Sequence, residues 1–439
     1  MAEVLPTAPD NERTPAPIEV DETLVGDVNA LLRDGQRGMV LNLVQDLHPA
    51  DLAQLLRHLP PDTTDTLFGW LPEEQAGAVL PEMERARRTD LLEEMPPHQI
   101  VGLLDEISTD DAADVLGDLP PEIAAQVLPR LEDAPEVEGL LHFEEDTAGG
   151  LMEADFVAVQ AGATVAEATE ELRSCAEEVD PVYVLYVVDE DRKLLGLVDL
   201  KRLVLARADV PVTALMDTDI VTVEPDVDQE EVARIMERYD LVALPVVSAG
   251  GVLIGRITID DVVDVIREEA EEDFQRASGI AGDEEFSASV FAISRGRLVW
   301  LLIGLVGAFL SGLVIRGFEG ALEAATVLAV FIPIVMAMAG NAGIQSSAIA
   351  VQGLASGELW SSDVAGRLGK ELLVALLNGA ALAVALGLLV IVLPLGATDS
   401  GDLALTAVLS LLIVIVLATV LGAVIPLLLA RVGIDPALA

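Results

Sequence analysis

The chain has 439 residues, of which 52% are hydrophobic, and a formal net charge of −49 at pH 7. This length exceeds what one hydrophobic core usually organises, so we expect two or three domains. The acidic excess excludes nucleic acid as a partner, because phosphate binding depends on Lys and Arg. Cys175 is the single cysteine, which excludes an internal disulfide framework.

The charge is unevenly distributed along the chain. Only eight of the 74 acids and six of the 25 bases lie in residues 294–439. Two explanations for the acidic remainder stay open: a solvated surface suited to high salt, and carboxylate clusters that bind divalent cations. The two are compatible. We attribute most of the acids to the first explanation, which favours a halophilic source.

The first 145 residues divide into a tail and a helical region. Residues 1–22 are acidic and contain several prolines, which is typical of a disordered tail and unlike a signal peptide, so we expect a cytoplasmic N-terminal region. Residues 23–145 repeat short amphipathic segments with Pro or an acid near each start, which predicts an all-α helical superhelix. The four histidines are scattered there, and we expect surface or capping roles for them. They are His48, His58, His98 and His142.

Residues 146–266 change from a helical to a mixed period. Two copies of an apolar run, a helix, two further apolar runs around a turn and a second helix follow one another, the clearest parts being residues 182–206 and 241–266. Two copies of one such unit should pack as a pseudo-symmetric α+β pair. Residues 244–247, with sequence LPVV, and residues 255–261, with sequence GRITIDD, resemble a CBS motif, and the region is identified as a tandem CBS pair.

The CBS resemblance has an implication for nucleotide binding. In CBS pairs, a Thr or Ser followed three residues later by Asp often faces a nucleotide, and Thr258 and Asp261 have this spacing. The first copy has Asp199 and Arg202 at those places, so the resemblance implies at most one nucleotide pocket. A structural pair without a nucleotide stays open as the alternative.

The last two regions lead into and through a membrane. Residues 267–293 are expected to form an acidic connecting helix, either a plug-like element or a plain connector. Residues 294–439 contain four apolar stretches that are close to or longer than the roughly 20 residues needed to cross a bilayer, and the basic residues around them place the N-terminus inside. The expected spans are residues 298–315, 325–351, 372–393 and 403–429.

The second expected span carries polar groups and helix-breaking residues at membrane depth. Unpaired polar groups are costly in hydrocarbon, so they should face other helices or a water-filled path. The candidate pore residues are Pro333, Gly340, Asn341, Gly343 and Gln345. Close packing between helices, helped by small residues, is the alternative explanation.

The order of these regions resembles the MgtE family of magnesium transporters and channels. The most specific matches are residues 146–152, with sequence DTAGGLM, residues 228–234, with sequence DQEEVAR, and residues 340–345, with sequence GNAGIQ after Pro333. The resemblance implies a homodimer in membrane lipid, Mg²⁺ as both transported and regulatory ion, and ATP as a candidate ligand of the CBS pair. It implies a multi-pass protein of the cell membrane with cytoplasmic N-terminal domains.

The resemblance also implies a set of cation-sensing acids. Clustered carboxylates repel one another until a hard divalent cation neutralises them, so Mg²⁺ would hold the domains together and the gate shut. The implied positions are Asp110, Asp114, Asp228, Glu230, Asp240, Asp261, Glu269, Glu272 and Asp273. Asp261 belongs to both the nucleotide and the magnesium interpretation.

Three questions stay open from the residues alone. A membrane-tethered Mg²⁺ or adenine-nucleotide sensor without transport, and a transporter of another divalent cation such as cobalt, are alternatives; an enzyme is not expected. The resemblance further implies a fifth membrane helix after an Asp-Pro-Ala turn, and here residues 435–437 begin that turn near the end of the sequence. We expect truncation, with a separate pore-completing polypeptide or a non-conducting protein as alternatives.

Overall fold

The computed structural model describes residues 20–175, 179, 181–277, 290–320, 326–355, 364–392, 400–432 and 436. The chain divides into two compact units, residues 1–267 and 268–439, which are described separately. The expected tail lies outside the described residues up to residue 19, and the first helix begins at Glu22. Asp435 and Ala437 of the expected turn also lie outside them.

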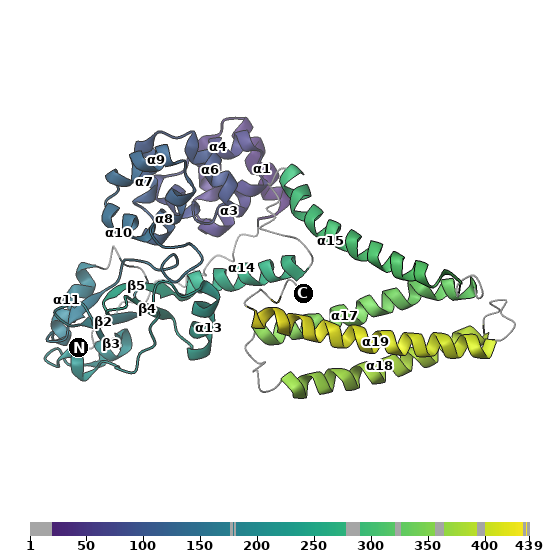
Figure 1. Cartoon of the computed structure of the whole chain (residues 1–439). Helices are drawn as coiled ribbons and strands as arrows, with labels where there is room; N and C mark the ends of the chain where they lie inside the picture. Colours follow the sequence, from purple (N-terminus) through teal and green to yellow (C-terminus); the bar gives the residue numbers. More distant parts are fainter. Residues whose placement is uncertain are drawn as a thin grey trace, which may run out of the picture. The chain divides into compact units, whose positions relative to one another are not determined.

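Short helices fill the first half of unit 1, as the sequence predicted (Figure 1). They are α1 (Glu22–Arg33), α2 (Arg37–Val44), α3 (Pro49–His58), α4 (Pro61–Phe68), α5 (Glu73–Val79), α6 (Arg85–Glu93), α7 (Pro97–Leu104), α8 (Thr109–Asp118), α9 (Pro121–Val127), η1 (Leu128–Arg130) and α10 (Ala134–Leu140). Proline opens α3, α4, α7 and α9, where its missing N–H costs nothing. His48 caps α3 by accepting a hydrogen bond from the Ala50 amide, which confirms a capping role.

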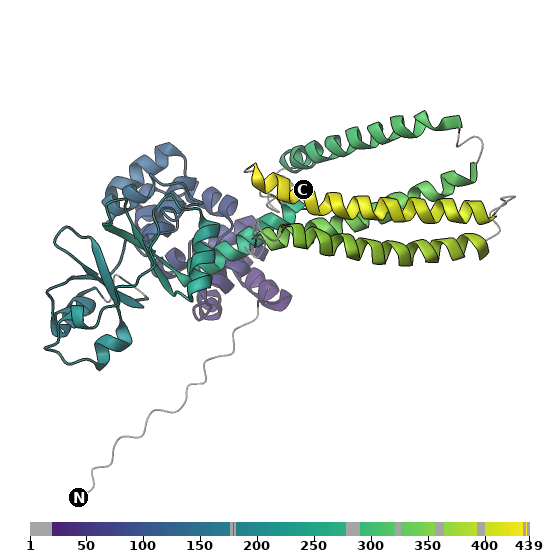
Figure 2. The ribbon, with the colours of Figure 1, turned by 60° about the horizontal axis from the view of Figure 1, so that its bottom comes forward.

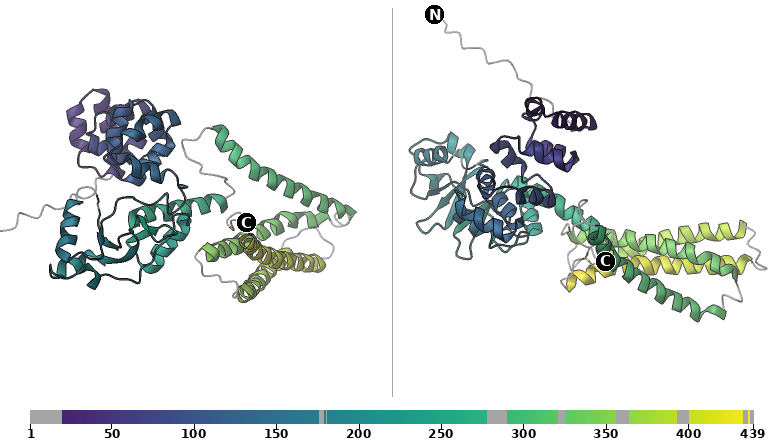
Figure 3. Two further views of the ribbon diagram at one scale, coloured as in Figure 1. Left: turned by 60° about the vertical axis from the view of Figure 1, so that its left-hand side comes forward. Right: turned by 90° about the horizontal axis from the view of Figure 1, so that it is seen from above.

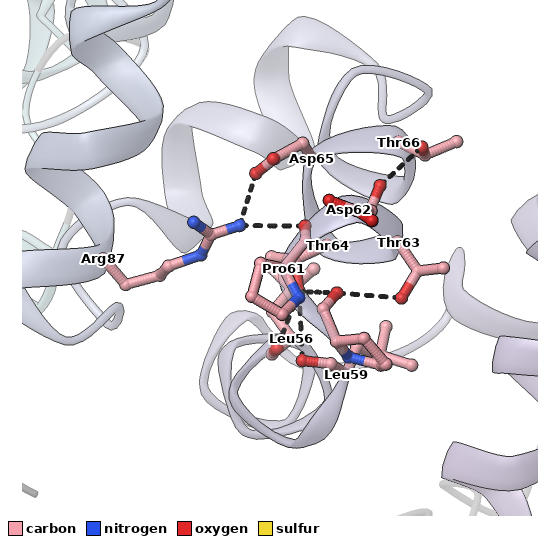
Figure 4. Close-up of polar contacts among 10 residues, drawn as sticks. Leu56, Leu59, Pro61, Asp62, Thr63, Thr64, Asp65, Thr66 and Arg87 are labelled. Atoms are coloured by element: carbon pink, nitrogen blue, oxygen red, sulfur yellow. Dashed lines mark hydrogen bonds and ion pairs between the residues drawn. The ribbon is translucent and has the colours of Figure 1, made fainter. Parts of the chain in front are cut away.

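Each helix is too short to be stable alone, so the array depends on burial and on contacts between neighbours. Leu52, Leu55 and Leu56 of α3 are buried in the common core. Figure 4 shows one polar joint between helices: Arg87 of α6 donates to the Pro61 carbonyl at 3.0 Å and pairs with Asp65 of α4. These contacts join α6 to α4, the helix two places before it in the chain.

The CBS pair follows in the same unit, below the helical array in the left view of Figure 3. Its elements are β1 (Ala158–Gln160), α11 (Val165–Ser174), β2 (Val184–Val188), β3 (Leu194–Asp199), α12 (Leu200–Leu205), η2 (Val212–Ala214), α13 (Gln229–Tyr239), β4 (Ala243–Val247), β5 (Leu253–Thr258) and α14 (Ile259–Ala277). The first repeat has a sheet of order β1-β2-β3, with β1 parallel to β2. In the second repeat the first strand is reduced to a parallel bridge between Val223 and Val246.

The two repeats meet through their hairpins in a pseudo-symmetric arrangement. The Leu194 amide donates to the Gly251 carbonyl at 3.0 Å, and the Leu253 amide donates to the Arg192 carbonyl at 3.1 Å. Arg192 and Gly251 occupy equivalent turn positions and both have positive φ, 61° and 76°. Asp189 supports the first turn, because its carboxylate accepts from the Asp191 and Lys193 amides.

The segment entering each repeat also pairs with the last strand of the other repeat. Leu197 in β3 of the first repeat and Asp217, which leads into the second, exchange two backbone hydrogen bonds of 3.1 and 2.8 Å. Arg256 in β5 of the second repeat and Glu153, which leads into the first, do the same, at 3.0 and 2.8 Å. Arg256 therefore occupies the position that Leu197 occupies in the first repeat.

The described residues of unit 2 form four helices that are long and apolar enough to cross a membrane, as the sequence predicted. The helices are α15 (Val290–Gly317), α17 (Phe331–Ala355), preceded by η3 (Thr326–Val330), α18 (Val364–Val392) and α19 (Ser400–Arg431). In Figures 1 and 2, α17, α18 and α19 run side by side, and α19 packs along both of the others. Gly422 of α19 meets Gly343 of α17 so closely that a Cβ at Gly422 would lie 2.4 Å from the Gly343 carbonyl oxygen.

The predicted connecting helix is described only at its ends. The helix α14 begins in the second CBS repeat and continues without interruption to Ala277. Residues 278–289 lie outside the described part of the chain, and α15 begins at Val290. The N-terminal part of the connecting segment is therefore the continuation of a CBS helix.

Candidate functional site

The site is a group of acids between the helical array and the second CBS repeat, with the buried Asp110 among them. Asp110 lies in the first turn of α8 and is only 7% exposed. Asp260 and Asp261 lie in the first turn of α14, directly after β5. The sequence positions them because α8 begins directly after Ser108, whose hydroxyl donates to the Asp111 carboxylate at 2.9 Å, and because the strand β5 ends at Thr258. Helix N-termini favour negative charge, which partly offsets the cost of this arrangement.

The acids of the two domains influence one another electrostatically. Burial and the negative charges of Asp110 and Asp260 together raise the pKa of Asp261 to about 8, against the lowering effect of a hydrogen bond from Thr258. Burial likewise raises the pKa of Asp114 to about 7, with Asp110 and Asp111 adding to the effect. Three predicted residues, Asp110, Asp114 and Asp261, are thus brought into one electrostatic cluster.

The cluster has an acceptor atom without a protein donor. Burial raises the pKa of Asp110, and its Oδ1 atom is buried with no hydrogen-bond partner among the described residues. A buried acceptor without a partner is costly, and a hydrated hard cation would supply both charge and O–H donors to it. Among the described residues no three His, Cys, Asp or Glu side chains form a ready-made metal site. A Mg²⁺ ion at Asp110 would therefore have to keep several of its own waters as ligands.

Two arginine side chains lie at the edges of this cluster. Arg88 of α6 pairs with Asp118 of α8 at 2.7 Å and lowers the pKa of Asp111, which burial raises to about 7. Arg256 of β5 pairs with Glu153 at 2.6 Å. Sequence reasoning did not single out Asp111, Glu153, Asp260 or these arginines. Asp111 and Asp260 are each adjacent to a predicted acid, which could have indicated them, whereas nothing in the local pattern indicates the pairing of Glu153 with Arg256.

Other predicted cation-binding acids lie elsewhere in the fold. Asp228 caps α13, where its carboxylate accepts from the Glu230 amide at 2.9 Å, and Asp240 ends the same helix with a left-handed φ of 52°. Glu269, Glu272 and Asp273 lie on the part of α14 that belongs to unit 2, and Glu272 pairs with Arg276. The structure gives Asp228 and Asp240 local roles as helix caps, and a role in cation binding stays a prediction.

The predicted nucleotide residues are engaged within the chain. Thr258 is fully buried, and its hydroxyl donates to Asp261 at 2.9 Å and is also hydrogen-bonded to Asp260. The Thr-x-x-Asp spacing thus orders the first turn of α14.

The polar stretch of α17 divides between two faces of the helix. Gly343 meets Gly422, and Ser346 is buried and donates to Glu371 of α18 at 3.3 Å. Asn341 and Gln345 lie on the opposite face, and like Pro333 and Gly340 they are exposed in the single chain. Packing between helices accounts for Gly343 and Ser346. The amides of Asn341 and Gln345 are left for another partner or an aqueous path.

Comparison with known proteins matches most of the helical array, both CBS repeats and the chain from residue 332 onward. Residues 47–146 match the MgtE intracellular N domain, residues 148–209 and 212–268 match the CBS domain, and residues 332–439 match a family described as divalent cation transporter. The magnesium transporter MgtE of Thermus thermophilus is 39% identical over 69% of this chain and 67% of its own length. The magnesium transporter MgtE of Bacillus subtilis is 33% identical over 69% of this chain and 66% of its own length.

A solved structure extends the comparison to three dimensions. The crystal structure of the cytosolic domain of the Mg²⁺ channel MgtE in complex with ATP is 35% identical, covers 55% of this chain and 99% of its own, and has a TM-score of 0.53. The helical and CBS domains are therefore cytoplasmic and the four apolar helices form a multi-pass membrane region. This family comprises transporters, which agrees with the expectation that the chain is not an enzyme. The chain belongs to the MgtE family of divalent cation transporters.

Proposed function

We propose that this chain is a magnesium channel or transporter of the cell membrane that is closed by cytosolic Mg²⁺. The observation that carries the proposal is the buried cluster in which Asp110 of α8 raises the pKa of Asp261 in the second CBS repeat. Acids from two domains repel one another, and this repulsion can be relieved in two ways: the domains separate, or a cation neutralises the acids. Such a pair of domains can therefore sense the cation concentration.

Gating follows from the different cation affinity of two arrangements. With the domains together, the Oδ1 atom of Asp110, which has no hydrogen-bond partner among the described residues, lies in one cluster with the other carboxylates, and their repulsion favours a bound cation. With the domains apart, each carboxylate is hydrated alone. A cation that binds the closed arrangement more tightly shifts the population towards it, and α14, which starts at the cluster, would carry the change.

Permeation would use the exposed face of α17. Mg²⁺ gives up its waters reluctantly, so amide oxygens such as that of Asn341 suit a hydrated ion. We propose that a second copy of the chain faces this surface, because polar amides exposed to lipid would be costly. Cobalt or another divalent cation is the alternative cargo, and the acidic surface of the cytosolic unit suits a halophilic source.

A second ligand is favoured by one relative. The cytosolic domain of the Mg²⁺ channel MgtE, 35% identical, was solved in complex with ATP. We propose ATP as a ligand of the CBS pair with Thr258 and Asp261 at the ribose. Since Asp261 also belongs to the acidic cluster, ATP and Mg²⁺ binding should influence one another, which titration of ATP at several Mg²⁺ concentrations would measure.

The decisive experiment is Mg²⁺ flux into vesicles that contain the purified chain, at controlled Mg²⁺ on the cytosolic face. The double variant D110N/D261N should need about tenfold more cytosolic Mg²⁺ for half-inhibition, within the usual range of coupling energies. The variant E170Q, at an exposed acid of α11, is the matched control and should behave as the parent chain. Equal inhibition of all three chains would contradict the gating proposal. Absence of flux from the parent chain, with Mg²⁺-dependent protease protection of residues 264–277, would favour a sensor without transport.

A further inference from the structure

A buried ion pair joins the entry of the CBS region to the last strand of its second repeat. Arg256 and Glu153 are 2% and 8% exposed. The guanidinium of Arg256 donates from Nε to Glu153 at 2.8 Å, pairs through Nη2 at 2.6 Å, and donates from Nη1 to the Pro181 carbonyl at 2.7 Å. Together with the two backbone hydrogen bonds between the same residues, this makes Glu153 the most firmly held part of its segment.

The first repeat shows that the fold does not require this ion pair. Leu197 occupies the position equivalent to Arg256, and its backbone partner Asp217 is exposed, with a carboxylate that accepts from the Asp219 amide at 3.1 Å. Burying a charged pair usually costs as much as it returns, and apolar residues often replace such pairs without loss of stability. The charged pair of the second repeat therefore needs an explanation other than stability.

The segment that Arg256 holds also contacts the helical array beside the acidic cluster. The Ala154 amide donates to the hydroxyl of Thr109 at 3.1 Å, and Asp155 is hydrogen-bonded to the same threonine. Thr109 precedes Asp110 in the first turn of α8. Residues 153–155 thus connect β5 to the start of α8, and β5 leads directly to Asp260 and Asp261.

We infer that the Glu153–Arg256 ion pair is a cation-independent tether and that Arg256 is a positioning residue for the cation-sensing cluster. The inference rests on the proposed sensing function. When Mg²⁺ leaves, repulsion among the acids opens the cluster. The tether still holds residues 153–155 against β5, and these residues keep α8 close to the position that it has in the closed arrangement. A larger fraction of the cation-free protein is then competent to bind, which lowers the Mg²⁺ concentration needed for closure.

Hydrogen–deuterium exchange on the full-length chain in lipid nanodiscs tests this inference, with and without Mg²⁺. In the parent chain, Mg²⁺ removal should speed exchange in residues 108–116 and leave residues 150–158 protected. In R256L, which copies the first repeat, residues 150–158 should exchange faster even without cation. The Mg²⁺ concentration that half-protects residues 108–116 should rise about tenfold, as expected for the loss of charge-assisted hydrogen bonds.

Three further variants separate the tether from other effects. E153Q/R256L also removes the negative charge that R256L leaves unpaired. If the ion pair is a tether, the double variant should exchange as fast as R256L in residues 150–158. A return to the parental exchange rate would overturn the inference. R256K, which keeps one charged contact, should give an intermediate shift. R173L breaks an exposed pair with Glu170 in the same domain and should change nothing.

The outcomes also distinguish the tether from the sensing function. If Mg²⁺ does not alter residues 108–116 in the parent chain, cation sensing at this cluster is wrong, and the tether is still judged by exchange in residues 150–158. If R256L and E153Q/R256L leave residues 150–158 as protected as in the parent chain, the tether is wrong. Loss of protection at residues 150–158 in the parent chain on Mg²⁺ removal would overturn it as well.

Discussion

Burial and, after it, the negative charge of Asp110 in the helical array raise the pKa of Asp261 in the second CBS repeat, although the two residues belong to different domains. Both carboxylates are largely buried, so neither can lower its electrostatic energy by turning to solvent. Each domain alone would expose its acid to water, where ionisation is cheap. The energetic conflict arises only when the domains are together, and it links their association to proton and cation concentration.

The stability of the cytosolic unit without divalent cation should fall as pH rises. The folded pKa values of Asp114 and Asp261 are raised by burial to about 7 and about 8, from an ordinary 3.8. The folded protein therefore binds more protons than the unfolded chain, and this stabilisation, complete below pH 4, is lost as pH rises through 7 to 8. Thermal unfolding in chelator should show a lower Tm at pH 8.5 than at pH 6.

Magnesium should remove most of that dependence. A cation bound by ionised carboxylates stabilises the folded state at high pH, where protons no longer do. Saturating Mg²⁺ should raise the Tm at pH 8.5 by more than at pH 6, and D110N/D261N should lessen the difference. An equal rise at both pH values would show that these carboxylates do not bind the ion.

The two glycines at the contact of α17 and α19 should differ in their tolerance of alanine. A Cβ at Gly422 would lie 2.4 Å from the Gly343 carbonyl oxygen, so G422A forces the helices apart and should cost about 1–3 kcal/mol. A Cβ at Gly343 would lie 3.6 Å from the Ala418 carbonyl oxygen, an ordinary contact. Unfolding of the two variants in mixed micelles should therefore rank G422A well below G343A. Equal stability would mean that the close contact does not persist in lipid.

Replacing Asn341 by alanine should impair flux without affecting the fold. Asn341 is exposed on α17, so its removal leaves the contacts with α18 and α19 intact. We expect at least about a tenfold lower Mg²⁺ flux, as for the loss of an oriented hydrogen-bonding group in a pore, with an unchanged Tm. Unchanged flux would show that Asn341 only packs against lipid or a second copy.

Removing the hydroxyl of Ser346 should, in contrast to N341A, lower the stability of the fold. Ser346 is buried and bonds to Glu371, which also pairs with Arg367 at 3.2 Å on its own helix. S346A leaves a buried carboxylate with one fewer donor and should lower stability by about 1–3 kcal/mol. E371Q, which can still accept from Ser346, should be milder. If S346A is as stable as the parent chain, the bond contributes nothing to helix packing.

Sequence reasoning found the elements but not every pairing between them. The four spans follow from runs of apolar residues, and the CBS repeats follow from strand period and the turns at residues 189–191 and 249–251. These signals are local. The pairing of Glu153 with Arg256 depends on a bridge between distant segments, which becomes visible only when the two repeats are superposed in their pseudo-symmetric positions. The division of the α17 polar residues between two faces likewise needed the position of α19.

The uninterrupted course of α14 has a mechanical consequence. Its first turn holds Asp260 and Asp261, and the same helix continues for 19 residues to Ala277. A helix of that length extends about 28 Å and can move as a rigid rod, so a movement of its first turn in the acidic cluster also moves its other end. A tilt of about 5° at the acids would displace the far end by about 2 Å, without any change in the backbone between them.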